Sequence, residues 1–416
     1  MFRYRSQLIL AAMPVLTVWI ASKPTPSPAA PAQSMPSTPS GHTVTGIDEY
    51  EAMNSELFAG KRVGLITNQT GVDSEGRRTM DIISHPGEMK LVAIFSPEHG
   101  IDGRADAHVA DSTDERTGLS ILSLYTETRR PTDEMLNGID VLIFDIQDAG
   151  VRFYTYITTM AYCMEAAAKH HITFVVFDRP DPLGGEVIEG PMLDADRTSF
   201  TGYFPMPVRY GMTIGELAKM FNAENKIGAD LKVFPMRNWR RSDAYDQTGL
   251  KWIPPSPNLR TLNAAFLYPG IEILQAGGVS VGRGTAAPFE ILGAPWIHGA
   301  QFAVALERRK IPGVSFSPTQ FTPTEGIYKG QACRGVRIAI TNRDALRSMR
   351  MGLEIADALH RMYPGDFHLD KVIELLGSQA TIDRLERGDS PADIVAGWSA
   401  DIEKFRAMRE KYLLYR

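Results

Sequence analysis

The sequence predicts an α/β fold: a Rossmann-like domain with a doubly wound parallel sheet, followed by a smaller α+β domain. Five short runs of Val, Ile, Leu and Phe in the first half do not alternate with polar residues, which is typical of strands buried on both faces. Helical segments separate these runs, and this alternation favours parallel strands joined by right-handed crossovers. The length of 416 residues exceeds what one hydrophobic core usually organises, so two domains are expected.

The polar ends of the five predicted strands indicate where a ligand would bind. The strands lie within residues 62–71, 91–100, 121–125, 141–150 and 174–182. Ligands of such sheets bind beyond the carboxyl ends of the strands, so the polar side chains at those ends are the first candidates. They are Asn68, Gln69, Glu98, His99, Tyr125, Asp145, Gln147, Asp148, Asp178 and Arg179. A site built from them would be acidic, with one arginine and several amides.

The remaining elements follow from similar patterns. Helices are expected at residues 46–59, 76–84, 131–137, 157–170, 213–222, 343–363 and 391–414, and further strands at 231–235, 313–318 and 335–341. Thr213 is a candidate N-cap. The glycine-rich stretch 270–293 suits a loop that closes over a ligand, because glycine permits close backbone approach. We place the first domain at residues 44–200 and the covering second domain at residues 201–416.

The N-terminal segment predicts export. Residues 1–22 begin with basic side chains and continue into fourteen apolar residues, as a signal peptide does. Fourteen residues are short for a membrane span, which needs about twenty, so no stable span is expected after processing. Residues 23–43 are rich in Pro, Ser and Ala and should form a disordered linker. The protein is therefore expected in the periplasm or outside the cell.

Charge and cysteine content exclude some classes of function. The formal net charge is −5, and the first 40 residues contribute bases but no acid, so the rest of the chain is more acidic still and nucleic acid is not an expected partner. Cys163 and Cys333 form either a single disulfide or, as we prefer, two free thiols, because no disulfide framework is evident. No GxGxxG motif follows the first strand, so no dinucleotide cofactor is expected, and we predict none of any kind.

Glu98 is the leading catalytic candidate. It follows the apolar run LVAIF directly, so it should sit on a rigid strand end in a partly desolvated crevice, where the pKa of a carboxyl group rises. That would make it a proton donor, although a capping or ion-pairing role is equally compatible with its position. The neighbouring His99 could orient Glu98, bind a substrate or be structural.

A second group of candidates follows the fourth strand. Arg152, Tyr154 and Tyr156 lie at even spacing, and if that stretch is extended all three project to one side. They would then offer a guanidinium group to a carboxylate and two tyrosines to bind or stack on a ring. The alternative is a core-packing junction around Phe153.

The long polar loop after Glu98 raises a metal-dependent alternative. Its potential metal ligands are His99, Asp102, Asp106, His108 and Asp111. Their spacing matches no known metal site, so no metal ligand is predicted, but a metal-dependent esterase or amidase stays an alternative.

Four motifs give a resemblance to a known family. They are SPEHG, FDIQDAGVRFYTY, DRPDPLGG and PPSPNL. With them the chain, from about Val44 onward, resembles the exo-β-N-acetylmuramidase family (NamZ-like, long catalogued as a domain of unknown function), which removes terminal N-acetylmuramic acid from peptidoglycan fragments. The resemblance implies a Rossmann-like domain joined to a smaller α/β domain, with the active site in the cleft between them. It also implies that Glu98, the SPEHG glutamate, is the catalytic acid.

The resemblance implies roles for further residues. For the second acidic function we place Glu165 ahead of Glu189, or else the substrate's own acetamido oxygen acts, oriented by Asp145 or Glu165. The lactyl carboxylate of the sugar would meet Arg152 or Arg283, and Asn68, Gln147 and Asn258 suit its hydroxyl and acetamido groups. The expected partner is a muramic-acid-containing sugar or muropeptide. A muropeptide-binding protein without turnover is the rival interpretation, and the oligomeric state is left open.

Overall fold

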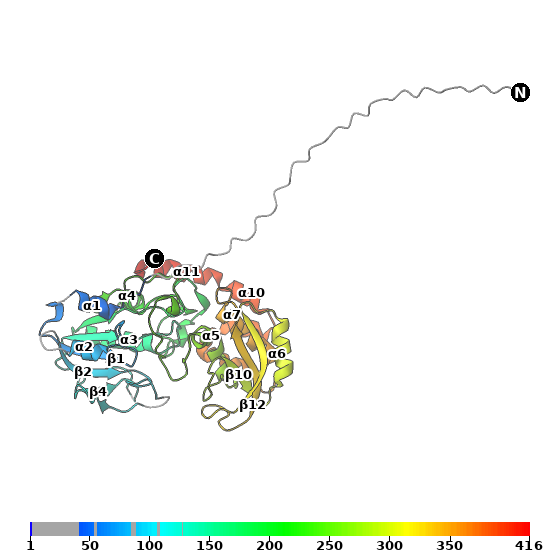
Figure 1. Ribbon diagram of the computed structural model, residues 1–416, viewed down its shortest axis with the longest axis horizontal. Helices are drawn as coiled ribbons and strands as arrows, with labels where there is room; N and C mark the ends of the chain where they lie inside the picture. The colour runs from blue at the N-terminus through cyan, green and yellow to red at the C-terminus, as the bar shows by residue number, and fades with distance from the viewer. Residues whose placement is uncertain (2–40, 54–55, 85–88, 106–108, 127) are drawn as a thin grey trace. The chain divides into compact units, whose positions relative to one another are not determined.

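The structure is a computed structural model. Besides Met1 it describes residues 41–53, 56–84, 89–105, 109–126 and 128–416 (Figure 1). The predicted signal peptide, most of the predicted linker, and Asp106 and His108 lie outside these residues.

The larger sheet has seven strands in the order β3-β4-β2-β1-β5-β6-β9, and all neighbours pair in parallel except β3 with β4. The strands are β1 (Arg62–Thr67), β2 (Lys90–Ser96), β3 (Ser112–Thr113), β4 (Ser120–Ser123), β5 (Val141–Asp145), β6 (Thr173–Phe177) and β9 (Leu231–Phe234). Chain order runs outward from β1 through β2 to β4, and then from β5 through β6 to β9 on the other side. This is the doubly wound arrangement that the sequence predicts, and the order reverses between β1 and β5.

Helices cover both faces of this sheet, which is why its strands are continuously apolar. They are α1 (Gly46–Ala52), α2 (Thr79–Ile83), α3 (Tyr156–Lys169) and α4 (Ile214–Glu224). Along β5, Ile143 belongs to the core that α1 and α2 cover, whereas Phe144 belongs to the core that contains side chains of α3 and α4. Successive side chains of a strand point to opposite faces, so both faces are buried and the strand has no polar side.

A smaller antiparallel sheet lies apart from the larger one, with the strand order β10-β12-β11 (Figure 1). Its strands are β10 (Ile291–Ala294), β11 (Val314–Phe321) and β12 (Cys333–Ile340), and the helices around it are α5 (Leu262–Ile271), α6 (Gly299–Arg308) and α7 (Ser348–Met362). Helices α5 and α7 cross at Gly270 and Gly352. A Cβ atom on Gly270 would lie 1.9 Å from the Ser348 carbonyl oxygen, so only glycine permits this crossing.

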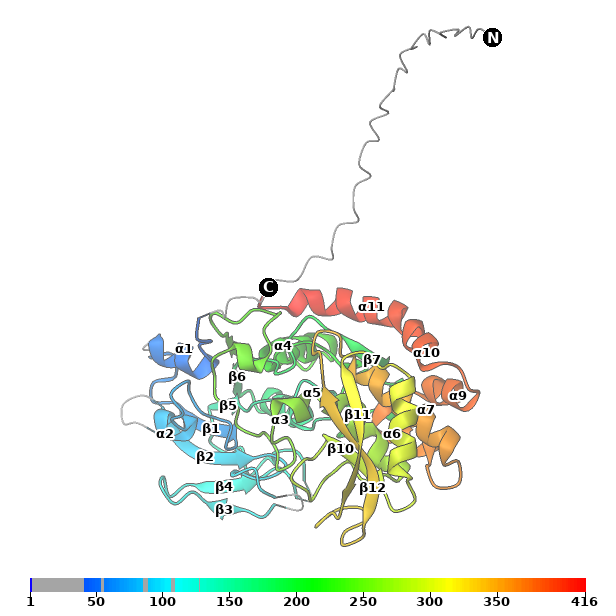
Figure 2. The ribbon, with the colours of Figure 1, turned by 45° about the vertical axis from the view of Figure 1, so that its right-hand side comes forward.

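The C-terminal helices lead back toward the larger sheet (Figure 2). They are α8 (Ile373–Leu376), α9 (Gln379–Glu386), α10 (Pro391–Gly397) and α11 (Ser399–Arg409). The chain then places the hydroxyl of Tyr415 against the Asp178 carboxylate at the end of β6, a hydrogen bond of 2.5 Å. A short antiparallel pair, β7 (Glu189–Met192) with β8 (Pro207–Arg209), completes the strands of the described residues.

Several sequence expectations differ from the structure. Residues 131–137 form turns and not a helix, and the helix expected at 391–414 is divided at Trp398. Strand β9 belongs to the larger sheet and helix α4 packs on it, although both lie beyond residue 200, where the first domain was predicted to end. Both cysteines are buried and free, as preferred from the sequence. Among the described residues, none of the helices combines the length and apolar character needed to cross a membrane.

Candidate active site

A cavity of about 330 Å³ lies between the carboxyl edge of the larger sheet and helix α5. We call it the Glu98 cavity. From the sheet side it is lined by Glu98, His99 and Tyr154, and from the other side by Tyr268, Glu272 and Arg283. It therefore brings residues more than 160 positions apart in the sequence into one polar space.

Glu98 is held by a tight turn that begins where β2 ends. The Gly100 amide donates to the Pro97 carbonyl at 3.0 Å, and His99 adopts the left-handed conformation with φ 71°. This conformation is uncommon outside glycine. A hydrogen bond of 2.7 Å between the His99 Nδ1 atom and the Ala105 carbonyl holds the imidazole. The Glu98 Oε2 atom accepts a hydrogen bond from the Thr155 hydroxyl, directly before α3. Two elements thus fix this carboxyl group.

Two buried tyrosines back the cavity. The Tyr156 hydroxyl accepts from Asn68 Nδ2 at 3.1 Å and lies 2.7 Å from the Pro255 carbonyl, to which it donates. The Tyr154 and Tyr156 rings are 4.8 Å apart, edge to face. Burial raises the pKa of both phenols, which keeps them neutral. Asn68 lies behind Tyr156 and orients it.

The opposite wall carries a second carboxyl group, that of Glu272. Its Oε1 atom lies 2.6 Å from Arg283 Nη2, and the Arg283 guanidinium carbon is 5.3 Å from the centre of the Phe289 ring. Tyr268 and Glu272 were not predicted as site residues, because their segment was read as a glycine-rich loop. Tyr268 and Glu272 are four residues apart, and Gln275 follows three residues later. This spacing places the three side chains on one face of a helix and could have identified them as site residues.

Arg152 does not line the Glu98 cavity. Residues 152–155 form a turn and not an extended strand, so the Arg152 side chain does not project to the same side as those of Tyr154 and Tyr156. The guanidinium group is fully buried and donates to the carbonyls of Pro191, Met206, Leu375 and Leu376 at 2.7–3.1 Å. Burial lowers the pKa of Arg152 to about 9. Its contacts join β7 and β8 to the C-terminal helices.

The other predicted acids also lie outside this cavity. Glu165, on α3, forms an ion pair with Arg130 and accepts from the Tyr203 hydroxyl at 2.8 Å, and its side chain is 34% exposed. Glu189, in β7, is buried 3.7 Å from an Arg209 nitrogen. Burial raises the pKa of Glu189. Neither side chain is among those that line the Glu98 cavity.

Four further candidates lie at the ends of β5 and β6. Asp145 is fully buried and pairs with Arg179 Nε at 2.6 Å. Asp178 accepts from the Gly215 amide at 2.7 Å and so fixes the start of α4. Arg179 and Gln147 line a different cavity, described below. Asn258, the predicted second-domain contribution, is buried two residues after Ser256, which lines the Glu98 cavity.

The described residues contain one group of acids close enough to share a metal ion, Asp48, Glu51 and Asp73. Arg77 already pairs with Glu51 at 2.8 Å and with Asp73 at 2.5 Å, and Asp48 accepts hydrogen bonds from Thr45 and Ser74, so each of the three acids has a protein partner. The group does not include His99, and Asp106 and His108 of the predicted loop lie outside the described residues.

Comparison with known proteins agrees with the four motifs. Two family descriptions match: "Exo-beta-N-acetylmuramidase NamZ, N-terminal" at residues 63–263 and "Exo-beta-N-acetylmuramidase NamZ, C-terminal" at residues 266–415. The chain is 42% identical over 376 residues to the peptidoglycan beta-N-acetylmuramidase NamZ of Bacillus subtilis (strain 168), which covers 89% of this chain and 91% of that protein.

Two solved structures are similar along nearly the whole length. They are crystal structures of DUF1343 family proteins from Bacteroides fragilis, with TM-scores of 0.83 and 0.73 at 38% and 31% identity. Each match covers 90% of this chain and 99% of the other. With both halves matched and the predicted motifs present, the chain belongs to the exo-β-N-acetylmuramidase (NamZ) family.

Proposed function

We propose that this protein is an exo-acting glycoside hydrolase that releases terminal β-linked N-acetylmuramic acid from peptidoglycan fragments, with Glu98 as its proton donor. One observation carries the assignment of the site: Glu98 and Glu272 place two carboxyl groups in one cavity, in a chain that is 42% identical to a peptidoglycan β-N-acetylmuramidase. The muropeptide-binding alternative without turnover is not favoured by this family membership.

The reaction needs a proton for the leaving oxygen and a negative group near the anomeric carbon. Thr155 donates to Glu98 Oε2, which leaves Oε1 to hold the proton. Glu98 gives this proton to the glycosidic oxygen as the C1–O bond breaks and its electron pair stays with the leaving sugar. Water then adds to C1 and loses a proton to Glu98, which restores the acid.

We assign the second carboxyl function to Glu272 and not to Glu165, which the sequence favoured. Glu272 faces the same cavity as Glu98, and its contact with Arg283 stabilises the negative charge that an oxocarbenium-like centre requires. Glu165, on α3, is not among the residues that line this cavity. The Arg283 guanidinium also offers a partner for the lactyl carboxylate of the sugar.

Replacing Glu272 by glutamine is expected to lower kcat about a hundredfold, the size of effect seen when one catalytic acid or base is lost. The change keeps the shape of the side chain and removes its charge. The matched control is Glu165→Gln, for which we expect kcat within about twofold of wild type, because an exposed ion pair contributes little. Initial rates on a β-N-acetylmuramide check both. The opposite ranking of the two variants would restore Glu165 as the second group.

Replacing Thr155 by valine removes the hydroxyl that orients Glu98 without changing the volume of the side chain. We expect kcat to fall about fivefold with KM little changed, because one hydrogen bond contributes about 1 kcal/mol and its loss misaligns only the Glu98 carboxyl group. Thr155→Ser keeps the hydroxyl and should recover most of the rate. Equal losses in the valine and serine variants would show that Thr155 serves packing and not orientation.

The export predicted from residues 1–22 stays a prediction, since those residues lie outside the described part of the chain apart from Met1. It is compatible with a peptidoglycan-derived substrate.

A further inference from the structure

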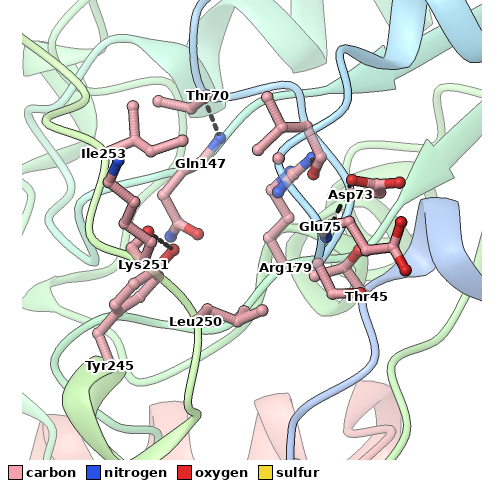
Figure 3. A pocket seen from close by; sticks show the side chains of 13 residues that line it. Thr45, Thr70, Asp73, Glu75, Gln147, Arg179, Tyr245, Leu250, Lys251 and Ile253 are labelled. Carbon is pink, nitrogen blue, oxygen red and sulfur yellow. Dashed lines mark hydrogen bonds between the residues drawn. The ribbon is translucent and has the colours of Figure 1, made fainter.

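A second cavity, of about 340 Å³, opens at the carboxyl ends of β1, β5 and β6 (Figure 3). We call it the Arg179 cavity. It lies where the strand order of the larger sheet reverses, which is where ligands of such sheets commonly bind. Glu98 is not among its lining residues. Segment 250–256 contributes to the walls of both cavities, since Lys251 lines the Arg179 cavity and Ser256 lines the Glu98 cavity.

Arg179 gives this cavity a buried guanidinium group, one nitrogen of which is not used in hydrogen bonds to described residues. Its side chain is 5% exposed, its Nε atom donates to Asp145 at 2.6 Å, and its Nη2 atom donates to the Val72 carbonyl at 2.7 Å. The Nη1 group donates to no residue that the structure describes. A guanidinium held in place by two of its three nitrogens is preorganised to bind an anionic oxygen with the third.

Gln147 gives the cavity an unused acceptor. Its Nε2 atom donates to the carbonyls of Asp148 at 2.9 Å and Pro180 at 2.8 Å, which fixes the orientation of the amide. Its Oε1 atom is buried and accepts no hydrogen bond from any described residue. A buried acceptor without a donor is destabilising, so a ligand that supplied an N–H group would relieve that cost.

Two acids, Asp73 and Glu75, also line the cavity, and Arg77 pairs with them at 2.5 Å and 3.6 Å. Lys251 is exposed at the rim and forms no ion pair within the described part of the chain. Leu250 and Ile253 give the cavity an apolar side. Its volume is at the lower end of the range for small-molecule sites, about 300–1,000 Å³. The cavity therefore suits a small molecule that is anionic at one end and carries an N–H group elsewhere.

We propose that the Arg179 cavity binds a small carboxylate that also carries an amide N–H group, with the carboxylate at Arg179 and Lys251 and the N–H group at the Gln147 oxygen. This inference rests on the proposed function for its sources. N-acetylmuramic acid, the product, has a lactyl carboxylate and an acetamido N–H group, and the peptide of a muropeptide offers the same two groups. The cavity would then retain a product or the peptide of a substrate apart from the catalytic carboxyls.

Calorimetric titration of the full chain with two probes tests the proposal: free N-acetylmuramic acid and the dipeptide L-alanyl-D-glutamate. Neither has a bond that the proposed reaction cleaves. Lys251→Glu should weaken the binding of whichever of the two probes binds by about tenfold, because it replaces an attraction to the probe's carboxylate by a repulsion. Lys310→Glu, at another exposed lysine, is the matched control and should change nothing. Leu250→Trp should fill the cavity and abolish binding, with the melting temperature confirming that the variant folds.

Arg283→Met separates the two cavities, because it alters the Glu98 cavity only. Binding that weakens in Lys251→Glu but not in Arg283→Met supports the proposal, and the probe that shows it identifies the source. Binding that responds only to Arg283→Met, or no binding of either probe at millimolar concentration, overturns it. Turnover measured on the same preparations keeps the two proposals apart. Wild-type turnover without this binding overturns the second site alone, and this binding without turnover supports the second site while overturning the hydrolase.

Discussion

Glu98→Gln is expected to lower kcat on a disaccharide substrate by about a thousandfold, within the range found for the loss of a general acid. Glutamine preserves the hydrogen bond from Thr155 but has no proton to give to the departing oxygen. A terminal β-N-acetylmuramyl disaccharide has a poor leaving group and depends fully on that proton. An aryl β-N-acetylmuramide leaves more readily, so we expect a smaller loss on it. Initial rates on the two substrates measure the difference.

The two carboxyl variants should separate by this comparison. Loss of the general acid lowers the rate most for the substrate with the poor leaving group. Loss of the carboxylate that stabilises C1 lowers the rates on both substrates alike. The loss of kcat in Glu98→Gln is therefore expected to differ strongly between the two substrates. The loss of kcat in Glu272→Gln should differ much less. Wild-type rates in Glu98→Gln on both substrates would refute the assignment of the acid. A leaving-group dependence found only in Glu272→Gln would exchange the two roles.

Arg152→Met is expected to lower the free energy of unfolding by about 3–5 kcal/mol, because it leaves buried carbonyls of four residues without their donor. Arg152→Lys should recover only part of this loss, since an ammonium group cannot reproduce the planar fork. Urea unfolding followed by circular dichroism measures both. The control is Arg334→Met, an exposed arginine with one carbonyl partner, which should cost less than about 1 kcal/mol.

The same variant tests the role that the sequence indicated for Arg152. A guanidinium that bound the substrate carboxylate would, when removed, raise KM and leave stability nearly unchanged. A guanidinium that joins β7 and β8 to the C-terminal helices would do the reverse. Stability equal to that of Arg334→Met, together with a raised KM, would contradict the structural role.

The sequence predicts the fold well because its signals are local. Val141 to Phe144 can be recognised as a doubly covered strand from four consecutive apolar residues, and their burial in two cores confirms it. Glu98 could be named as a candidate for a similar reason, since a carboxyl group directly after such a strand must lie at the sheet edge. The strand order also follows the expected winding.

Other candidates depended on geometry that spacing does not encode. Even spacing suggested one face for Arg152 and Tyr154, but a turn separates their directions. Glu165 lies on a helix whose rotation about its axis is set by packing, and the sequence left open whether it faced a cleft. Glu272 was hidden because Pro269 and Gly270 read as loop residues, although α5 accommodates both where it crosses α7.

The hydrogen bond between Tyr415 and Asp178 links positions 237 residues apart. During synthesis, β6 leaves the ribosome long before the residue that completes its carboxyl end. A nascent chain that ends after β9 therefore lacks one of the hydrogen-bond donors that contact Asp178 in the finished protein. The hydrogen bonding at the end of β6 is therefore complete only when residue 415 is present, and removing that residue would affect a strand that lies far away in the sequence.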